Sequence, residues 1–351
     1  MKDGDGIICV FCMLVNRKNG MAQKVAYKKY QTRFVEFLKA SVPNQVLLAN
    51  ELAELLSISK DSAYRRLRNE TPLSIDEAMV ICDQFNIDLT SFFEYKYQTI
   101  PFKFSKLYDG EKDLRSYFEN IHQIMDLGLS NNAKVTFAAE DIPVFHHFEY
   151  PNLAGFKIFY WQKAVLNDES LIGHKYSLDI MHPTLLDLAA QAVDKYNRLN
   201  SEEIWTEDSI HSTLSQVLYF AESGQFVSKA YALEVLQDVQ LMVEGLMRKA
   251  ERSSKTLDDQ KNFVLYNSEV RIGNNSILIQ AEDAARVFIS HNTFNSISTE
   301  NTSFCNETAL WMQNLIRKST PINDVSEKHR FQFFRSLFNK IDDTRSKIEL
   351  C

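Results

Sequence analysis

The sequence of 351 residues predicts a mostly α-helical protein with a smaller α+β part. Glycine and proline are scarce, at 10 and 7 residues, which disfavours turn-rich β folds. Apolar residues recur at helical spacing in most segments, and a strand-like pattern takes over only between residues 263 and 291. We therefore expect an N-terminal bundle of four or five helices, followed by a large helical region that contains a short antiparallel meander.

Residues 1–20 are predicted to form an extension without a structural role. Their apolar stretch, residues 7–15, is too short to span a bilayer, and neither a net-positive leader nor a small-residue cleavage site flanks it. A plain extension, with Met21 as an alternative natural start to Met1, is preferred over a peripheral anchor or a signal peptide. Cys9 and Cys12 are the only close pair among five cysteines, so we expect reduced thiols and no metal. We also expect no cofactor, no membrane partner and a cytoplasmic location.

Charge is unevenly distributed along the chain. The formal net charge of −7 excludes a uniformly basic, histone-like surface. Residues 21–97 hold as many acidic as basic residues, but residues 60–68 are cationic and the charged residues of 76–94 are all acidic. A small, charge-polarised module therefore precedes a large acidic region.

The first helices of this module follow from apolar spacing and capping residues. Residues 27–38 and residues 49–56 carry apolar side chains three or four positions apart, which predicts two amphipathic helices. The segment 57–59 interrupts this pattern, and Ser59 is placed as the N-cap of a helix over residues 60–68.

A further helix follows Thr71-Pro72, because Ser74 and Glu77 have the spacing of a capping box. Its predicted inward side chains are Ile75, Ala78, Ile81, Cys82 and Phe85.

Residues 49–68 have the pattern of a helix-turn-helix. Ala63 and Leu67 form the inward stripe of the second helix, and cationic and hydrogen-bonding side chains point elsewhere. A short helix held clear of the surface in this way fits a major groove about 12 Å wide. Its polar face suits phosphates and base edges.

These residues resemble the lambda-repressor-like (Cro/XRE) helix-turn-helix family. The resemblance lies in Leu52-Ala53, in the turn Ser57-Ile58-Ser59, in the helix 60–68 and in the junction 69–74, and it covers about residues 45–90. The chain is similar in particular to bacterial transcriptional regulators with a long uncharacterised C-terminal region. The resemblance implies a partner of double-stranded DNA and action as a homodimer on paired half-sites.

The residues expected to contact DNA project from the helix-turn-helix. Arg65 and Arg68 are expected to read bases or phosphates, because a guanidinium forks onto guanine O6 and N7 or onto a phosphate. Asn50, expected at the N-terminus of the first helix of the motif, would position a phosphate together with backbone amides. The predicted DNA-binding residues are Asn50, Ser59, Lys60, Asp61, Tyr64, Arg65 and Arg68.

Three positions depart from the family pattern or need a special backbone. Ser57 stands where the turn often has glycine, and Asn69 stands where a glycine C-cap is common, so both are expected in a left-handed conformation. Arg66 occupies a usually apolar position, and it must extend its head to solvent or contact a phosphate.

The remainder is predicted to comprise a mainly helical region for effector binding or dimerisation, residues 98–252, and an α+β region, residues 262–351. Helices are expected over residues 112–127, 153–166, 184–199, 208–223, 227–252, 306–318 and 325–341. Strands are expected over residues 133–139, 263–270, 276–282 and 285–291, of which the last three form the meander.

We expect no enzyme, because no catalytic or phosphate-binding motif is present. His146 and His147, on an extended segment, would point in opposite directions and could not easily share a metal. Glu140 and Asp141 fit an acid pair or, as we prefer, a turn cap. The aromatic cluster of residues 156–161 is interpreted as core in preference to a ligand box.

The sequence therefore favours a DNA-binding transcriptional regulator with a small-molecule or protein effector. The alternative is a protein-interaction module built on the same helical bundle that has lost DNA binding. An enzyme in the C-terminal half comes third. Salt-dependent affinity for duplex DNA separates the first two hypotheses.

Overall fold

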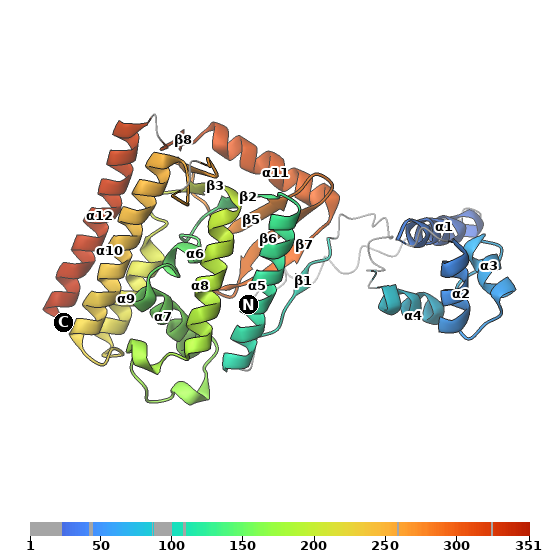
Figure 1. Cartoon of the computed structure of the whole chain (residues 1–351), viewed down its shortest axis with the longest axis horizontal. Helices are drawn as coiled ribbons and strands as arrows, with labels where there is room; N and C mark the ends of the chain where they lie inside the picture. The colour runs from blue at the N-terminus through green and yellow to red at the C-terminus, as the bar shows by residue number, and fades with distance from the viewer. Residues whose placement is uncertain are drawn as a thin grey trace, which may run out of the picture. The chain divides into compact units, whose positions relative to one another are not determined.

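The computed structural model describes residues 23–41, 45–85, 87, 100–107, 110–257, 260–323 and 326–351. The chain divides into two compact units, Met1–Pro101 and Phe102–Cys351, which Figure 1 colours from blue to red along the sequence. The predicted extension 1–20, the alternative start at Met21 and the pair Cys9 and Cys12 lie outside the described residues.

The described part of the first unit is a helical bundle. Its helices are α1 (Gln23–Ser41), α2 (Gln45–Leu55), α3 (Lys60–Leu67) and α4 (Ile75–Phe85). Each contributes a fully buried side chain to one core, in the order Leu38, Leu48, Ala63 and Ile81. The prediction for Ile75 is wrong: this residue is 80% exposed, because it is the first of α4 and precedes the turns that pack on the core.

The long helices of the second unit agree with the predicted apolar spacing, and α8 begins at Pro183, since proline suits the first position of a helix. The helices are α5 (Gly110–Ser130), α6 (Val144–His147), α7 (Pro151–Tyr160), α8 (Pro183–Arg198), α9 (His211–Glu222), α10 (Lys229–Arg252), α11 (Thr302–Arg317) and α12 (Glu327–Leu350). A π-helical turn, η2 (Trp161–Val165), continues α7, and two 3-10 turns follow, η3 (Glu169–Leu171) and η4 (Leu178–Ile180).

The strands of this unit form a single mixed sheet, in the order β1-β7-β6-β5-β2-β3-β4-β8. They are β1 (Lys103–Phe104), β2 (Lys134–Ala138), β3 (Asn200–Trp205), β4 (Phe263–Asn267), β5 (Ser276–Gln280), β6 (Ala285–His291), β7 (Asn295–Thr299) and β8 (Thr320–Pro321). β2, β3 and β4 are parallel, and the other neighbouring pairs are antiparallel.

The predicted fold class, a mostly helical region with a short antiparallel meander, is therefore wrong. β4 pairs in parallel with β3 and does not pair with β5, and the unpredicted β7 completes the antiparallel part. β3 gave little signal because residues 200–203 are polar or charged, and because its parallel partners lie far away in the sequence. Such pairing depends on tertiary contacts more than on local pattern.

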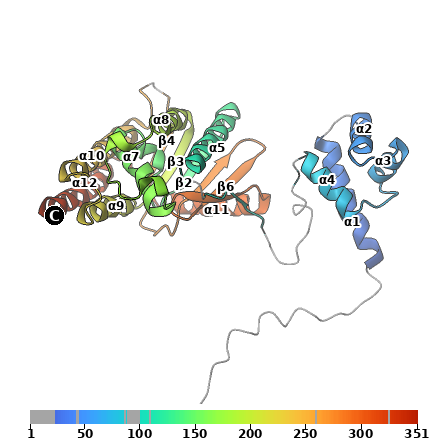
Figure 2. The same ribbon diagram turned by 90° about the horizontal axis from the view of Figure 1, so that it is seen from below.

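Helices cover both faces of this sheet. Ala138 and Leu278 pack with Met312 of α11, whereas Phe137 packs with Phe118 of α5 in the main core. Adjacent residues of a strand point to opposite faces, so α11 covers one face and α5 lies on the other. Figure 2 shows this arrangement. Within the described residues, no helix is both long and apolar enough to span a bilayer.

Candidate nucleic-acid interface

A tight turn joins α2 to α3 in the first unit. Ser57 has the expected left-handed conformation, with a φ of +52°, and the amide of Ile58 donates to the carbonyl of Ala53 at 2.9 Å. Ser59 Oγ then accepts from the amide of Ser62 at 3.2 Å. This bond satisfies one of the free amides of the first turn of α3. The predicted turn and N-cap are confirmed.

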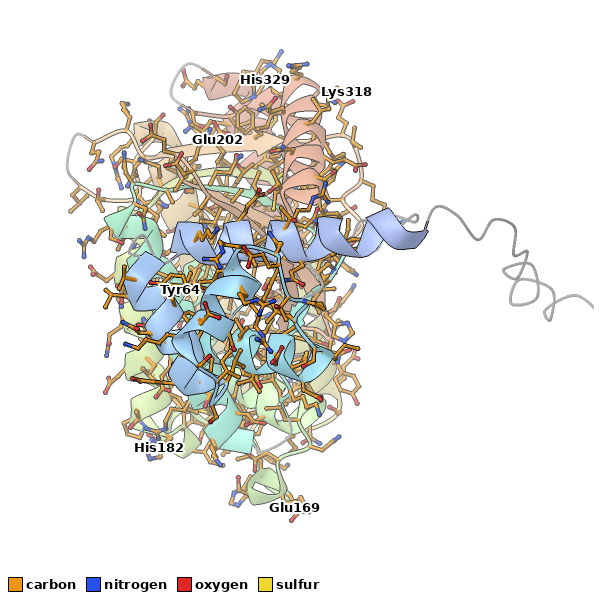
Figure 3. The ribbon with its side chains drawn as sticks, turned by 90° about the vertical axis from the view of Figure 1, so that its right-hand side faces the viewer. Tyr64, Glu169, His182, Glu202, Lys318 and His329 are labelled. Atoms are coloured by element: carbon orange, nitrogen blue, oxygen red, sulfur yellow. The ribbon has the colours of Figure 1, made fainter. Side chains whose placement is uncertain are left out.

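The two sides of α3 differ sharply. Ala63 and Leu67 are buried and dock the helix on α2, as predicted. Positions 60, 61, 64, 65 and 68 lie within about 140° of one another around the helix axis, at about 100° per residue. The exposed residues of this predicted DNA-contacting set are Ser59, Lys60, Asp61, Arg65 and Arg68. Tyr64, labelled in Figure 3, is half-buried and packs against the core of the bundle.

Two of the exposed arginines share one carboxylate. Arg68 donates to both oxygens of Glu70, at 2.7 and 3.1 Å, and Arg65 Nε lies 3.9 Å from Glu70. The hydrogen bond raises the pKa of Arg68 and lowers the pKa of Glu70. All three side chains are about half exposed, so an external anion can reach both guanidinium groups and compete with Glu70. Sequence spacing alone did not reveal this internal competitor.

Arg66 has a different role from the two that the sequence suggested. Its guanidinium donates to both oxygens of Glu77, at 2.6 and 3.1 Å, and to the carbonyl of Ser62 at 3.2 Å. Glu77 also accepts from the amide of Ser74 at 2.9 Å, and Ser74 Oγ accepts from the amide of Glu77 at 3.1 Å. The predicted capping box is thus confirmed. Arg66 fixes α3 to the start of α4 and is occupied within the bundle.

Gln31 of α1 supports the same junction and was missed by sequence reasoning. Its Nε2 donates to the carbonyl of Thr71 at 2.9 Å and to that of Arg66 at 3.3 Å, and its Oε1 accepts from the amide of Leu73 at 3.1 Å. These bonds hold the connection between α3 and α4 and thereby the orientation of α3. A polar residue on the inward side of an amphipathic helix was the available signal.

Asn50 does not lie where the sequence placed it. α2 begins at Gln45, so Asn50 is the sixth residue of the helix and is half-buried. The amides of α2 that lack helical partners belong to its first turn. The argument that Asn50 positions a phosphate together with these amides is therefore wrong, and any contact with DNA would involve its side chain alone.

The histidine pair of the second unit lies on α6 and not on an extended segment. His146 Nε2 lies 2.9 and 3.0 Å from the two carboxylate oxygens of Glu203, and His147 Nε2 lies 2.9 Å from Thr213 Oγ1. In the part of the chain that the structure describes, no three His, Cys, Asp or Glu side chains gather to hold a metal ion. Cys82, Cys305 and Cys351 form no disulfides.

Comparisons with protein families, curated proteins and solved structures find no match for this chain.

Proposed function

We propose that residues 23–85 bind double-stranded DNA with α3 in the major groove, and that the chain is a cytoplasmic transcriptional regulator that acts as a homodimer. The division of α3 into two sides carries the proposal. Ala63 and Leu67 fix the helix on the bundle, while Arg65 and Arg68 are exposed on the side away from them and Lys60 is exposed at the first position of the helix. This arrangement suits a helix that enters a groove and meets phosphates on its walls.

Glu70 gives the proposed surface a built-in competitor. A phosphate that approaches Arg65 and Arg68 replaces a carboxylate that is already half exposed, so part of the attraction is offset. Asp61 adds a second negative charge, although its place in the first turn of α3 also suits the helix dipole. Both carboxylates should weaken binding to DNA of arbitrary sequence more than binding that includes base contacts.

The protein-interaction alternative is supported by a different surface. α4 exposes Ile75, Met79 and Val80 together with Asp76 and Asp83. Apolar and acidic side chains on one helix are unsuited to a phosphate backbone and suit a protein partner. A chain that used only this surface would show no salt-dependent affinity for DNA.

The test compares full-length variants on a duplex selected by the wild-type protein from random sequences. Arg65→Ala combined with Arg68→Ala should weaken binding. If both contact phosphates, the magnitude of the slope of log K against log salt should fall by about 1.8, since each phosphate contact contributes about 0.9. Glu70→Gln should strengthen binding, because both arginines lose their internal partner. Fluorescence anisotropy at several salt concentrations measures the affinity and the salt slope of the wild type and of both variants.

The matched control removes two exposed arginines from the second unit, by Arg198→Ala combined with Arg317→Ala. Its slope should equal that of the wild type. If the Arg65 and Arg68 variant keeps the wild-type slope and affinity, or if the wild type selects no duplex at low salt, DNA binding through α3 is rejected in favour of the protein-interaction alternative.

A further inference from the structure

The second unit contains a cavity of about 420 Å³ between α5 and the sheet. One side of α5 forms one wall, through Tyr117, Ile121 and Ile124. Alternate residues of the sheet form the other wall, among them Phe137 of β2 and Phe288 of β6. This volume lies within the range of about 300–1,000 Å³ that is usual for small-molecule sites.

Aromatic rings are among the side chains that line this cavity. Trp161, on the π-helical turn after α7, stacks on Phe294 with ring centroids 4.7 Å apart. Tyr117 meets both rings edge-on, at 6.4 Å from Trp161 and 5.4 Å from Phe294. The predicted interpretation of Trp161 as plain core is therefore incomplete, since the ring also lines the cavity.

One end of the cavity holds buried charge without an opposite charge bonded to it. Lys157 is 5% exposed, and its Nζ donates to Gln216 Oε1 at 2.9 Å and to Thr213 Oγ1 at 3.4 Å, which are both neutral acceptors. An ammonium group has three donors, and burial lowers the pKa of Lys157. His147, 1% exposed, also lines this end, and its Nδ1 has no hydrogen-bond partner.

A carboxylate lines the same cavity as this ammonium group and is not paired with it. Asp141 lines the cavity, and its negative charge acts on Lys157 and partly offsets the effect of burial on the pKa of that lysine. The two side chains form no ion pair within 4.0 Å among the described contacts, and the buried Oδ1 of Asp141 has no hydrogen-bond partner. The cavity end therefore presents a donor and an acceptor of opposite charge that do not satisfy each other.

We propose that this cavity binds a small zwitterion with an aromatic or otherwise apolar side chain, such as an α-amino acid. The ligand carboxylate meets Lys157, the ligand ammonium meets Asp141, and the side chain lies against Trp161. A simple anion would leave Asp141 unpaired and a simple cation would leave Lys157 unpaired, whereas a zwitterion satisfies both.

This inference deepens the proposed function in one respect only: if the first unit binds DNA, the cavity is the place where an effector acts. Ligand binding itself does not require DNA. It is therefore tested without DNA, and its failure would leave the proposed DNA binding untouched.

The experiment titrates the full-length protein with three probes that share a phenyl group on a short chain. They are L-phenylalanine, 3-phenylpropionate and 2-phenylethylamine. Isothermal titration calorimetry measures affinity, and the change in tryptophan emission on excitation at a wavelength that phenyl groups do not absorb gives a second readout of binding to the second unit. We expect saturable binding of L-phenylalanine that is at least tenfold tighter than that of either single-charge probe.

Two substitutions assign the charges separately. Lys157→Met should weaken binding of L-phenylalanine and 3-phenylpropionate at least tenfold and should not weaken binding of 2-phenylethylamine. Asp141→Asn should weaken binding of L-phenylalanine and 2-phenylethylamine and should not weaken binding of 3-phenylpropionate. Lys157→Arg should restore part of the affinity lost in Lys157→Met, which separates loss of charge from loss of folding. Lys163→Met is the matched control, since Lys163 lies on η2 and donates to the carbonyl of His174.

The proposal is overturned if L-phenylalanine shows no saturable binding up to its solubility limit. It is also overturned if the three probes bind equally, or if Lys157→Met and Asp141→Asn, each folded by circular dichroism, bind all probes as the wild type does.

Discussion

The two units of this chain differ in how exposed their most connected charged side chains are. In the first unit Arg65, Arg68 and Glu70 are about half exposed and bonded to one another at the surface. In the second unit Glu203 is fully buried, and so nearly is Lys255. Exposed charged groups can exchange partners with an external molecule, whereas a buried charged group is stable only when its own neighbours satisfy it. The difference separates charge kept available for a partner from charge that fixes a fold.

Glu203 shows how complete this internal satisfaction is. Its carboxylate accepts from the hydroxyl of Tyr196 at 2.7 Å, from Nε1 of Trp205 at 3.0 Å and from Nε2 of His146 at 2.9 Å. Burial would raise the pKa of Glu203, but His146 and the hydroxyl of Tyr196 outweigh it, and the pKa is lowered. The group joins β3, α6 and α8, so we expect it to be a structural centre of the second unit.

The largest predicted effect comes from Glu203→Gln. The glutamine amide has only one acceptor oxygen, so its N–H₂ group would face at least one of the buried donors of Tyr196, Trp205 and His146. All three donors would also lose their charged acceptor. We expect the free energy of unfolding of the second unit to fall by about 3 kcal/mol or more. All three tryptophans, Trp161, Trp205 and Trp311, lie in this unit, so their fluorescence during urea unfolding measures it selectively.

Glu202→Gln is the matched control on the same strand. Glu202, labelled in Figure 3, pairs with Lys134 at 2.7 Å, and this pair reaches solvent, since the lysine is 50% and the glutamate 20% exposed. Such a pair contributes about 0–1 kcal/mol, so the control should shift the transition little. Equal losses at positions 202 and 203 would contradict the distinction between exposed and buried charge.

The second predicted effect is a pH dependence that Lys255 gives to the second unit. Its Nζ donates to the carbonyl of Tyr196 at 2.7 Å and to Ser201 Oγ at 2.8 Å. Burial nevertheless lowers the pKa of Lys255 to about 7. An unfolded lysine has a pKa of about 10.4, so between about pH 7 and 10 the unfolded chain binds the extra proton and stability rises with pH.

The variant Lys255→Met should remove this contribution, which approaches about 1.4 kcal/mol per pH unit while one proton is taken up on unfolding. Urea unfolding followed by tryptophan fluorescence at several pH values within that range measures the slope. Lys261→Met, a substitution of an exposed lysine two residues before β4, should keep the wild-type slope. A slope that is the same in Lys255→Met and in the wild type would show that Lys255 stays protonated in the folded state.

The contrast between the units also explains what the sequence could predict. Ser59, Ser74 and Ser57 act on residues at most four or five positions away, so their caps and turn were legible in the local pattern. The arginine side of α3 followed from helical spacing in the same way. Partners at longer range could not be predicted from the local pattern. Glu77 is eleven positions from the Arg66 that it binds, and Gln31 donates to the carbonyl of Thr71.

The prediction of the sheet in the second unit was wrong for the same reason, because its strands and their buried polar groups depend on partners far away in the sequence. Glu203 made β3 look polar, because nothing in its neighbourhood shows that His146 and Tyr196 will bury it. The cavity could not be predicted either, since Lys157 and Asp141 come from separate segments, and only the folded chain shows that Lys157 bonds to neutral acceptors while Asp141 Oδ1 has no partner. Local rules therefore predict elements well and predict the satisfaction of buried polar groups poorly.

The smallest predicted effect confines itself to the first unit. Ser57 adopts a φ of +52° in the turn before α3. This conformation costs a residue with a Cβ about 1–2 kcal/mol, whereas glycine adopts it without that cost. Glycine in turn favours the unfolded chain by about 0.5–1 kcal/mol, because its backbone has more conformational entropy there. Ser57→Gly should therefore stabilise the bundle by up to about 1 kcal/mol. Asn69→Gly, at a φ of +59°, should gain less, because asparagine tolerates this conformation better.

Hydrogen exchange of amides in α2 and α3 measures this gain as slower exchange in Ser57→Gly. Destabilisation by glycine at position 57 would show that Ser57 contributes more through its side chain than it costs through its backbone. The tryptophan transition of the second unit serves as the internal control. If Ser57→Gly shifts that transition, the two units unfold as one, and stability measured by tryptophan could no longer be assigned to the buried charges of the second unit alone.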